Sequence, residues 1–220
     1  MTTKPKVAVV LSGCGVFDGT EIHEAVLTLL ALDRQGAEYQ CFAPDVQQHH
    51  VVDHLSGNET GEARNALVES ARIARGKIRD LAGFDAARHD ALIFPGGFGA
   101  AKNLSSFAAD GPEATVQPDV EAAILAMRAA GKPIGALCIS PVLLARVLGD
   151  VEVTIGDDAG TASAIEQMGG THRPATHGEV VVDTANKVAT TPCYMLDATV
   201  GQIADGAHNV VAAVLGMIGR

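Results

Sequence analysis

One cysteine, Cys138, stands where an apolar segment meets small residues and a proline, in the run GALCISP at residues 135–141. A sharp turn from a strand into a helix at this place would lift the sulfur above a sheet, as a nucleophile elbow lifts a catalytic hydroxyl. The helix N-terminus would favour the thiolate, and the amide of Ile139 would face a developing oxyanion. The alternative is an ordinary core thiol, because free cysteines are among the most buried residues. The run therefore predicts a nucleophile that needs support from elsewhere in the chain.

Two other segments could give that support. The run FPGGFG at residues 94–99 places Gly96 beside Gly97, and adjacent glycines let backbone amides approach a ligand closely. It predicts a second oxyanion donor, although a plain tight turn explains the same residues. Glu24 lies near the start of a predicted helix, where the dipole alone favours an acid. A carboxyl that faces Cys138 could instead stay protonated, donate a hydrogen bond to the thiolate or move protons.

Hydrophobic periodicity predicts that strands alternate with helices, which is typical of a parallel sheet covered on both faces. The predicted strands are Lys6–Leu11, Glu38–Ala43, Asp90–Phe94, Pro133–Leu137 and Val151–Ile155, followed by Glu179–Asp183 and Lys187–Thr190 as a hairpin or tight reversal. The predicted helices are Glu21–Gln35, Glu62–Arg75, Asp119–Ala130, one near Ala159–Met168 and a final one at about Leu196–Met217. In such folds the site lies beyond the carboxyl ends of the strands, so the chemistry-bearing segments should meet at one edge.

The segment Val46–Gly61 is polar and has no clear periodicity. We expect a surface excursion here, with a short strand at His50–His54, that could carry oligomer contacts. Its histidines could suggest a metal site, but only Asp53 stands beside them, and an exposed polar loop explains them as well. We therefore predict no metal site.

Composition narrows the classes of function. The 220 residues fit a single domain, and 47% hydrophobic residues with only 4% aromatics indicate a core of small aliphatic side chains. The net charge of -10, without a cluster of basic residues, argues against nucleic acid as a partner. No apolar run is long enough for a membrane helix or the core of a signal peptide. We expect a cytoplasmic protein with no membrane partner.

The four cysteines are Cys14, Cys41, Cys138 and Cys193, and no two of them form a C-x-x-C pair. This spacing argues against a zinc site or a disulfide framework, so all four should be thiols. Cys41, on an apolar strand, is predicted to lie in the core. Cys14 is the better candidate for a second thiol near the site, although a spectator role explains it more simply.

Three longer runs carry a resemblance to a known family: LSGCGVFDGTEIHEAVLTLLA at residues 11–31, PGGFGAAKNLSSFA at 95–108 and TTPCYML at 190–196. Within the superfamily of class I glutamine amidotransferases, PfpI-type proteases and Parkinson-associated deglycase-like proteins, the chain resembles the ElbB family, the isoprenoid-biosynthesis glyoxalases or enhancing-lycopene-biosynthesis proteins. The resemblance spans essentially the whole chain. It implies one class I glutamine amidotransferase-like domain over residues 1–220, with a flavodoxin-like three-layer α/β sandwich and a mostly parallel central sheet.

The resemblance also implies a homodimer that converts a small dicarbonyl, such as glyoxal or methylglyoxal, to its hydroxy acid with no added cofactor. By position, Cys138 is the nucleophile and Glu24 the first-helix glutamate, while Gly97 and Ile139, with Gly96 beside them, form the oxyanion and substrate-binding site. Many relatives carry a histidine shortly after the cysteine helix, but this chain has VTIGDD at residues 153–158. Without that base, slow turnover is expected.

Two other motifs, one catalytic and one nucleotide-binding, compete with this interpretation. A glutamine amidotransferase would pair the cysteine with a His-x-Glu motif, which His177-Gly178-Glu179 matches by letters, although earlier in the chain than such pairs usually stand. A dinucleotide site would use Gly13 and Gly15, but Gly19 comes one position late for the G-x-G-x-x-G pattern. Both matches are weak.

The main non-enzymatic alternative is a cysteine redox sensor or chaperone-like protein. In it, Cys138 would be oxidised to a sulfinic acid held by Glu24, through the same local physics that would make a nucleophile. The sequence supports both functions equally.

Overall fold

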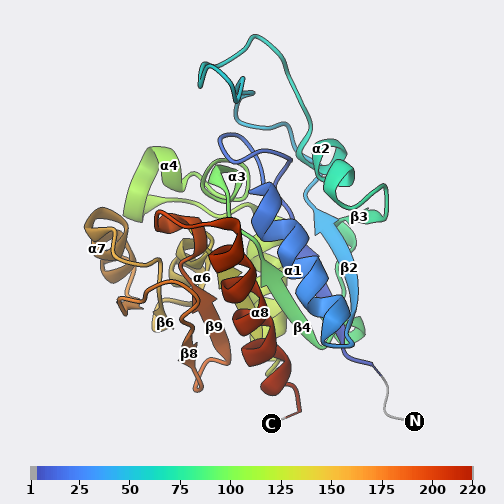
Figure 1. The fold of residues 1–220 in the computed structure, drawn as a ribbon, viewed down its shortest axis with the longest axis vertical. Coiled ribbons are helices and arrows are strands. Elements are labelled where there is room, and N and C mark those ends of the chain that lie inside the picture. Colours follow the sequence, from blue (N-terminus) through green and yellow to red (C-terminus); the bar gives the residue numbers. More distant parts are fainter. Residues whose placement is uncertain (1–3, 220) are drawn as a thin grey trace.

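The computed structural model describes residues 4–219, and its centre is a seven-stranded sheet with the strand order β3-β2-β1-β4-β5-β9-β8 (Figure 1). The strands are β1 (Lys6–Val10), β2 (Glu38–Ala43), β3 (Ile78–Asp80), β4 (Ala91–Phe94), β5 (Ile134–Leu137), β8 (Val181–Asp183) and β9 (Val188–Thr191). All neighbours are parallel except β8, which pairs antiparallel with β9. The predicted hairpin before the last helix is therefore confirmed.

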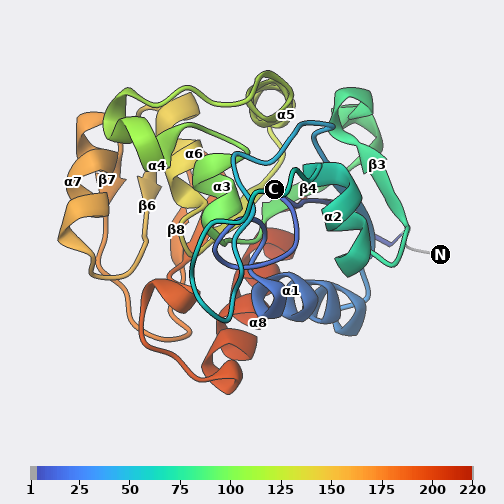
Figure 2. The same ribbon diagram turned by 90° about the horizontal axis from the view of Figure 1, so that it is seen from above.

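Helices cover both faces of this sheet. On one face α1 (Ile22–Arg34) and α8 (Val200–Gly216) lie side by side, and on the other α5 (Pro118–Ala129) packs beside α6 (Pro141–Leu148) (Figures 1 and 2). The shorter helices are α2 (Ala66–Ile73), α3 (Phe98–Lys102), α4 (Phe107–Asp110) and α7 (Ala159–Gln167), with 3-10 turns at Leu81–Gly83, Ala86–Arg88, Gly111–Glu113 and Cys193–Met195. The predicted α/β architecture of three layers with a mostly parallel sheet is confirmed.

The central strands are apolar throughout because both of their faces are covered. Every residue of β4, β5 and β9 is buried, and four of the five residues of β1 are. Such runs of Val, Ile, Leu and Ala lack the alternation of a strand with one wet face. The resulting core holds the carboxyl ends of β1, β4, β5 and β9 rigidly at one edge.

Some predicted elements are shorter than expected. The predicted helix over residues 62–75 begins only at Ala66, because the side chain of Asn65 accepts a hydrogen bond from Val68 N and caps it. The final helix begins at Val200 rather than near Leu196, because Thr199 and Gln202 form a capping box. These polar side chains satisfy the first backbone amides and so fix where each helix starts.

The predicted strand at residues 151–155 is also different. Only β6 (Glu152–Val153) is a strand, and it pairs with β7 (Thr171–His172) in a separate two-stranded sheet. The amide of Thr154 donates instead to the hydroxyl of Thr190, at 2.9 Å. A side-chain hydrogen bond thus replaces the ladder that would have continued the strand.

The polar segment 46–61 extends above the carboxyl edge of the sheet (Figure 1). The predicted strand at 50–54 is reduced to one isolated bridge between Val52 and Glu59. Val52 is nevertheless buried, and its amide donates to the carboxylate of Asp18 at 2.8 Å. Among the described residues no group of three or more His, Cys, Asp or Glu side chains could hold a metal ion, and no described helix has the length and apolar character to cross a membrane.

Candidate active site

Cys138 lies directly after β5, in a tight turn that leads into α6. The amide of Ser140 donates to the carbonyl of Leu137 at 3.0 Å, and the Ser140 hydroxyl donates to the carbonyl of Pro95 at 2.8 Å. Cys138 itself has φ +59°, in the left-handed region that L-residues other than glycine, asparagine and aspartate rarely adopt. Such a conformation costs about 1–3 kcal/mol and persists only where the surroundings enforce it. The predicted sharp turn is therefore present, and it is strained.

Glu24 lies in the first turn of α1 and is fully buried. Its Oε2 accepts a hydrogen bond from the amide of Gly96 at 2.9 Å, and its Oε1 accepts one from the amide of Tyr194 at 3.2 Å. A third hydrogen bond joins the carboxyl to the thiol of Cys138. The structure thus brings the predicted acid and the predicted nucleophile into direct contact, and it adds Tyr194, which the sequence analysis did not assign.

Backbone amides surround the sulfur as well. The amides of Gly97 and Ile139 both donate to Sγ of Cys138. An oxygen on a carbon bound to that sulfur would lie within reach of the same two donors, as an oxyanion site requires. Gly97 has φ +100°, so the turn that aims its amide suits a glycine.

Gly96 has a different role from the one expected. Its amide donates to Glu24 and not toward a substrate, so it positions the carboxyl instead of forming the oxyanion site. A Cβ at this position would overlap the Cβ of Cys138 and Oε2 of Glu24. A glycine here is therefore required for the close approach of the acid to the thiol.

Burial dominates the electrostatics of this pair. It raises the pKa of Glu24 to about 8, with the charge of Glu21 as the second cause. Burial and then the charge of Glu24 raise the pKa of Cys138 well above its usual value, against the two amides that lower it. The sequence analysis expected the helix dipole to favour the thiolate, and this is corrected: loss of hydration on burial outweighs the two amides. Burial therefore favours the neutral forms of both groups.

A cavity of about 450 Å³ opens onto the sulfur. Gly97, Cys138 and Ile139 line it together with the apolar side chains of Val16, Phe98, Ala101, Phe107, Ala108 and Met195 and the polar ones of Asp158, Thr161 and Tyr194. Among the described residues that line it, none is a histidine, lysine or arginine. The thiol therefore faces a mostly apolar chamber whose one carboxylate belongs to Asp158.

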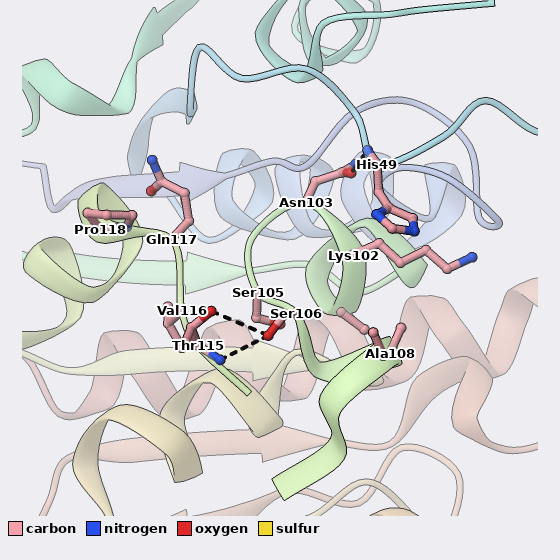
Figure 3. Close-up of a pocket in the computed structure, with 12 residues that line it drawn as sticks. His49, Lys102, Asn103, Ser105, Ser106, Ala108, Thr115, Val116, Gln117 and Pro118 are labelled. Atoms are coloured by element: carbon pink, nitrogen blue, oxygen red, sulfur yellow. Dashed lines mark hydrogen bonds between the residues drawn. The ribbon is translucent and has the colours of Figure 1, made fainter. Parts of the chain in front are cut away.

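A second cavity, of about 410 Å³, lies beside the first and shares Ala101 and Ala108 with it. Figure 3 shows its serine and threonine side chains turned toward one another. The hydroxyl of Ser106 accepts a hydrogen bond from the amide of Thr115 at 3.0 Å, and the hydroxyl of Ser105 donates to the carbonyl of Ala100 at 2.9 Å. These hydroxyls form hydrogen bonds within the fold, and no thiol lines this cavity among the described residues, so the first cavity is the candidate site.

The other thiols lie apart from that chamber. Cys41 is buried on β2, which raises its pKa to about 11, as expected of a core thiol. Burial and then the charge of Glu69 raise the pKa of Cys14, and Cys14 does not line the cavity. The second thiol near the site is Cys193, whose pKa burial and the charges of Glu24 and Cys138 raise. The prediction favoured Cys14 because the position of β9 beside β5 is not visible in local sequence.

The competing motifs find structural explanations. His177 is exposed, and its Nε2 lies 3.0 Å from the carbonyl of Asp197, so it contacts a surface loop rather than the thiol. In the glycine-rich turn, a Cβ at Gly19 would overlap the backbone of Gly13 and Cys14. The carboxylate of Asp18 is buried in the same turn. This turn is closely packed and carries a carboxylate, so it offers no binding site for a pyrophosphate.

Comparisons with known proteins show the family and the fold of the chain. No family model matches the chain. A human protein named glutamine amidotransferase-like class 1 domain-containing protein 3, mitochondrial, is 54% identical over 225 residues, which cover 98% of this chain and 84% of the human one. A rat protein named ES1 protein homolog, mitochondrial, is 51% identical over 227 residues, covering 99% and 85%. The names of both relatives place them in mitochondria, so they give no support to the cytoplasmic location expected from the sequence.

Solved structures share the fold of this chain. The crystal structure of an isoprenoid biosynthesis protein with amidotransferase-like domain from Ehrlichia chaffeensis superposes with a TM-score of 0.92 at 38% identity, over 97% of this chain and 99% of that one. A glyoxalase III from Candida albicans superposes with a TM-score of 0.61 at 14% identity, over 96% and 97%, a likeness that shows the fold alone. The chain has the flavodoxin-like fold, and it belongs to the family of the ES1 proteins and glutamine amidotransferase-like class 1 domain-containing protein 3.

Proposed function

We propose that the protein is a glutathione-independent glyoxalase, a lyase that converts small dicarbonyls such as glyoxal and methylglyoxal to hydroxy acids. One observation carries the proposal. A strained, buried cysteine shares a hydrogen bond with a fully buried carboxyl, while two backbone amides converge on the same sulfur at a cavity. The pair of thiol and acid can add to a carbonyl and move a proton, and neither step needs an added cofactor.

The chemistry proceeds through a covalent adduct. The sulfur of Cys138 adds to the aldehyde carbon, a C–S bond forms, and the thiol proton ends on the aldehyde oxygen. While that oxygen is charged, the amides of Gly97 and Ile139 stabilise it. Glu24 then removes the proton from the former aldehyde carbon and returns it to the neighbouring carbonyl carbon. The proton of the new hydroxyl passes to the oxygen of that neighbouring carbonyl, so that the former aldehyde carbon becomes the carbonyl of a thioester. Water hydrolyses the thioester, so that substrate plus water gives the hydroxy acid and the thiol is regenerated.

The redox-sensor alternative depends on a thiolate that persists in the resting protein at neutral pH. Burial raises the pKa of Cys138, so the resting sulfur keeps its proton and reacts slowly with oxidants. An enzyme needs the thiolate only while a substrate occupies the cavity. The cavity that opens onto Cys138 gives a substrate access to the sulfur and so favours an enzyme, with modest turnover because no histidine base lines the cavity among the described residues.

The finer assignments are also proposals. Membership of the ElbB family is proposed from the resemblance in sequence, while the name of the Ehrlichia chaffeensis structure refers to isoprenoid biosynthesis and an amidotransferase-like domain. The homodimer and the cytoplasmic location follow from the resemblance and the composition. Light scattering of the purified protein and fractionation of cells test these two directly.

The function is tested by incubating the purified protein with methylglyoxal and quantifying lactate. Wild type should form lactate, and Cys138→Ala should reduce the rate by about 10³-fold or more, because the nucleophile is lost. Cys41→Ala, which removes a buried thiol on β2, is the matched control and should retain the rate. Equal lactate formation by wild type and Cys138→Ala, or none by either, would contradict the proposal.

A further inference from the structure

We propose that the preferred substrates are α-oxoaldehydes with a bulky, apolar and uncharged substituent, and that Asp158 disfavours anionic ones. This inference rests on the proposed glyoxalase function and names the substrate class of the same site. It follows from three properties of the thiol cavity: its size, its apolar wall and its charge.

The cavity is larger than the smallest dicarbonyls need. Its volume of about 450 Å³ falls within the range of roughly 300–1,000 Å³ in which proteins bind ligands of drug size. Glyoxal and methylglyoxal have only a handful of heavy atoms, so most of the chamber would hold water when one of them reacts. A substituent that displaces this water from apolar walls would gain binding free energy in proportion to the area it covers.

The wall of the cavity suits such a substituent. Phe98 at the start of α3 and Phe107 at the start of α4 both line it, with Val16 and Met195 from two other segments. Phe98 is 47% exposed, although its neighbours Gly97 and Gly99 are buried. A large apolar side chain left open beside a reactive thiol is a surface that a ligand can cover. An aromatic substituent would pack against these two rings.

The charge of the cavity favours a neutral ligand. The carboxylate of Asp158 accepts a hydrogen bond from the amide of Thr161 at 2.7 Å, which is the main reason that its pKa is lowered. No lysine, arginine or histidine lines the cavity among the described residues. The ammonium of Lys102 lies 5.0 Å from the centroid of the Phe98 ring, but its Nζ already donates to the carbonyl of Phe17 at 2.9 Å and lies 2.9 Å from Nε2 of His50. Among the described residues that line the cavity, an anionic substituent would therefore meet one carboxylate and no cation.

The experiment measures kcat/KM for four substrates with the purified protein. These are glyoxal, methylglyoxal, phenylglyoxal and 4-carboxyphenylglyoxal, and the hydroxy acids formed are quantified by chromatography. Phenylglyoxal and its carboxylated analogue have nearly the same shape and differ in charge. We expect kcat/KM for phenylglyoxal to exceed that for methylglyoxal by about 10-fold or more, which is the range that added apolar groups reach in a fitting pocket. The carboxylated analogue should fall about 10-fold or more below phenylglyoxal.

Asp158→Asn separates charge from shape. Asp158 caps the N-terminus of α7, and asparagine caps a helix equally well, so the variant should fold normally. It should raise kcat/KM for 4-carboxyphenylglyoxal relative to phenylglyoxal by several fold. Asp157→Asn removes a neighbouring carboxylate that is exposed like that of Asp158 but does not line the cavity, and it should leave the ratio unchanged.

Phe107→Ala tests the apolar wall, with Phe17→Ala as its control, since Phe17 packs against His54 and does not line the thiol cavity. Only Phe107→Ala should reduce the preference for phenylglyoxal over methylglyoxal. If methylglyoxal yields lactate in a Cys138-dependent manner while phenylglyoxal is no better, or while both aspartate variants alter selectivity equally, this inference is wrong and the glyoxalase proposal stands. If no α-oxoaldehyde is consumed, the glyoxalase proposal fails and this inference fails with it.

Discussion

Two neighbouring turns of this molecule look alike and differ in what they can do. Cys138 follows β5 and Cys193 follows β9, and the two strands are paired in parallel, so both thiols lie at the same edge of the sheet. Both cysteines are buried and both have a positive φ, +59° for Cys138 and +43° for Cys193. The charge of Glu24 contributes to the raised pKa of both thiols. Burial, strain and a neighbouring acid are therefore common to the two turns.

The surroundings of the sulfur are what differ. Sγ of Cys138 accepts hydrogen bonds from the amides of Gly97 and Ile139 and borders the cavity. Cys193 does not line that cavity, and its Sγ packs toward α8, where it would lie 3.2 Å from a Cβ at Gly206. A thiol becomes a nucleophile only when a substrate can reach it and donors can hold the charge that develops. The comparison therefore assigns the role of nucleophile to Cys138, in the turn after β5.

The largest expected effect concerns the acid that serves the Cys138 turn. Glu24→Gln keeps an acceptor for the amide of Gly96 but cannot move protons, so lactate formation from methylglyoxal should fall about 10²–10⁴-fold.

In wild type, kcat/KM should rise as the pH increases toward 8, because the buried pair must lose one proton to react and the pKa of Glu24 is about 8.

The control for Glu24→Gln is Glu69→Gln. Glu69 is also buried near the start of a helix, but it pairs with Arg72 at 2.8 Å and does not line the thiol cavity. Its replacement should leave both the rate and the pH profile unchanged. Full activity of Glu24→Gln would show that the carboxyl does not take part in the reaction.

The second effect is on stability against pH. Glu24 has a usual pKa of 4.5 in the unfolded chain and about 8 when folded, so the folded state binds more protons between these values. Its contribution is fully present below pH 4.5 and is lost as the pH rises through 8. Wild type should therefore lose about 3 kcal/mol more of its free energy of unfolding than Glu24→Gln does between pH 5 and pH 8. Urea titrations at the two pH values measure it, and parallel pH dependence in both proteins would contradict the burial of an acid here.

The third effect compares glycines that face the two thiols. At Gly96→Ala the new Cβ would overlap Cys138 and Glu24, so the free energy of unfolding should fall by about 3 kcal/mol. At Gly206→Ala the new Cβ would meet Sγ of Cys193 at 3.2 Å, a tight contact that the gain of about 1 kcal/mol in helix propensity offsets. The two denaturation midpoints measure the difference. Equal losses would mean that the Cys193 turn is packed as tightly as the Cys138 turn.

The smallest effect is in chemical reactivity. With iodoacetamide at pH 8, peptide mass spectrometry should find Cys138 alkylated about 10-fold faster than Cys193, because of the two buried thiols only Cys138 borders the cavity. Alkylation of Cys193 first would reverse the assignment of the two turns.

Much of this site could be predicted because its parts are local in sequence. The elbow at Cys138, the glycines at 96 and 97 and the acid at Glu24 each follow or precede a recognisable apolar strand or helix, and the carboxyl ends of parallel strands share one edge. The prediction did not include the contacts made by β9. The hydrogen bond from the amide of Tyr194 to Glu24, and the position of Cys193 next to Tyr194, both depend on the pairing of β9 with β5.

Other errors have the same physical origin. The thiolate was expected from the helix dipole, a local property, whereas the pKa of Cys138 is set by burial under side chains from distant segments. The strand predicted at residues 151–155 ends early because Thr154 binds the hydroxyl of Thr190 instead. Local sequence patterns predicted the strands and helices and the edge of the sheet that carries the site. The pairing of strands distant in sequence determines which polar groups come into contact at that edge.

The most direct test compares Cys138→Ala with Cys193→Ala in lactate formation from methylglyoxal, with circular dichroism to confirm that both variants are folded. The account predicts that Cys138→Ala loses activity by about 10³-fold or more while Cys193→Ala stays within a few fold of wild type. Similar losses in both variants, or a loss confined to Cys193→Ala, would contradict the central claim that the turn after β5 carries the chemistry.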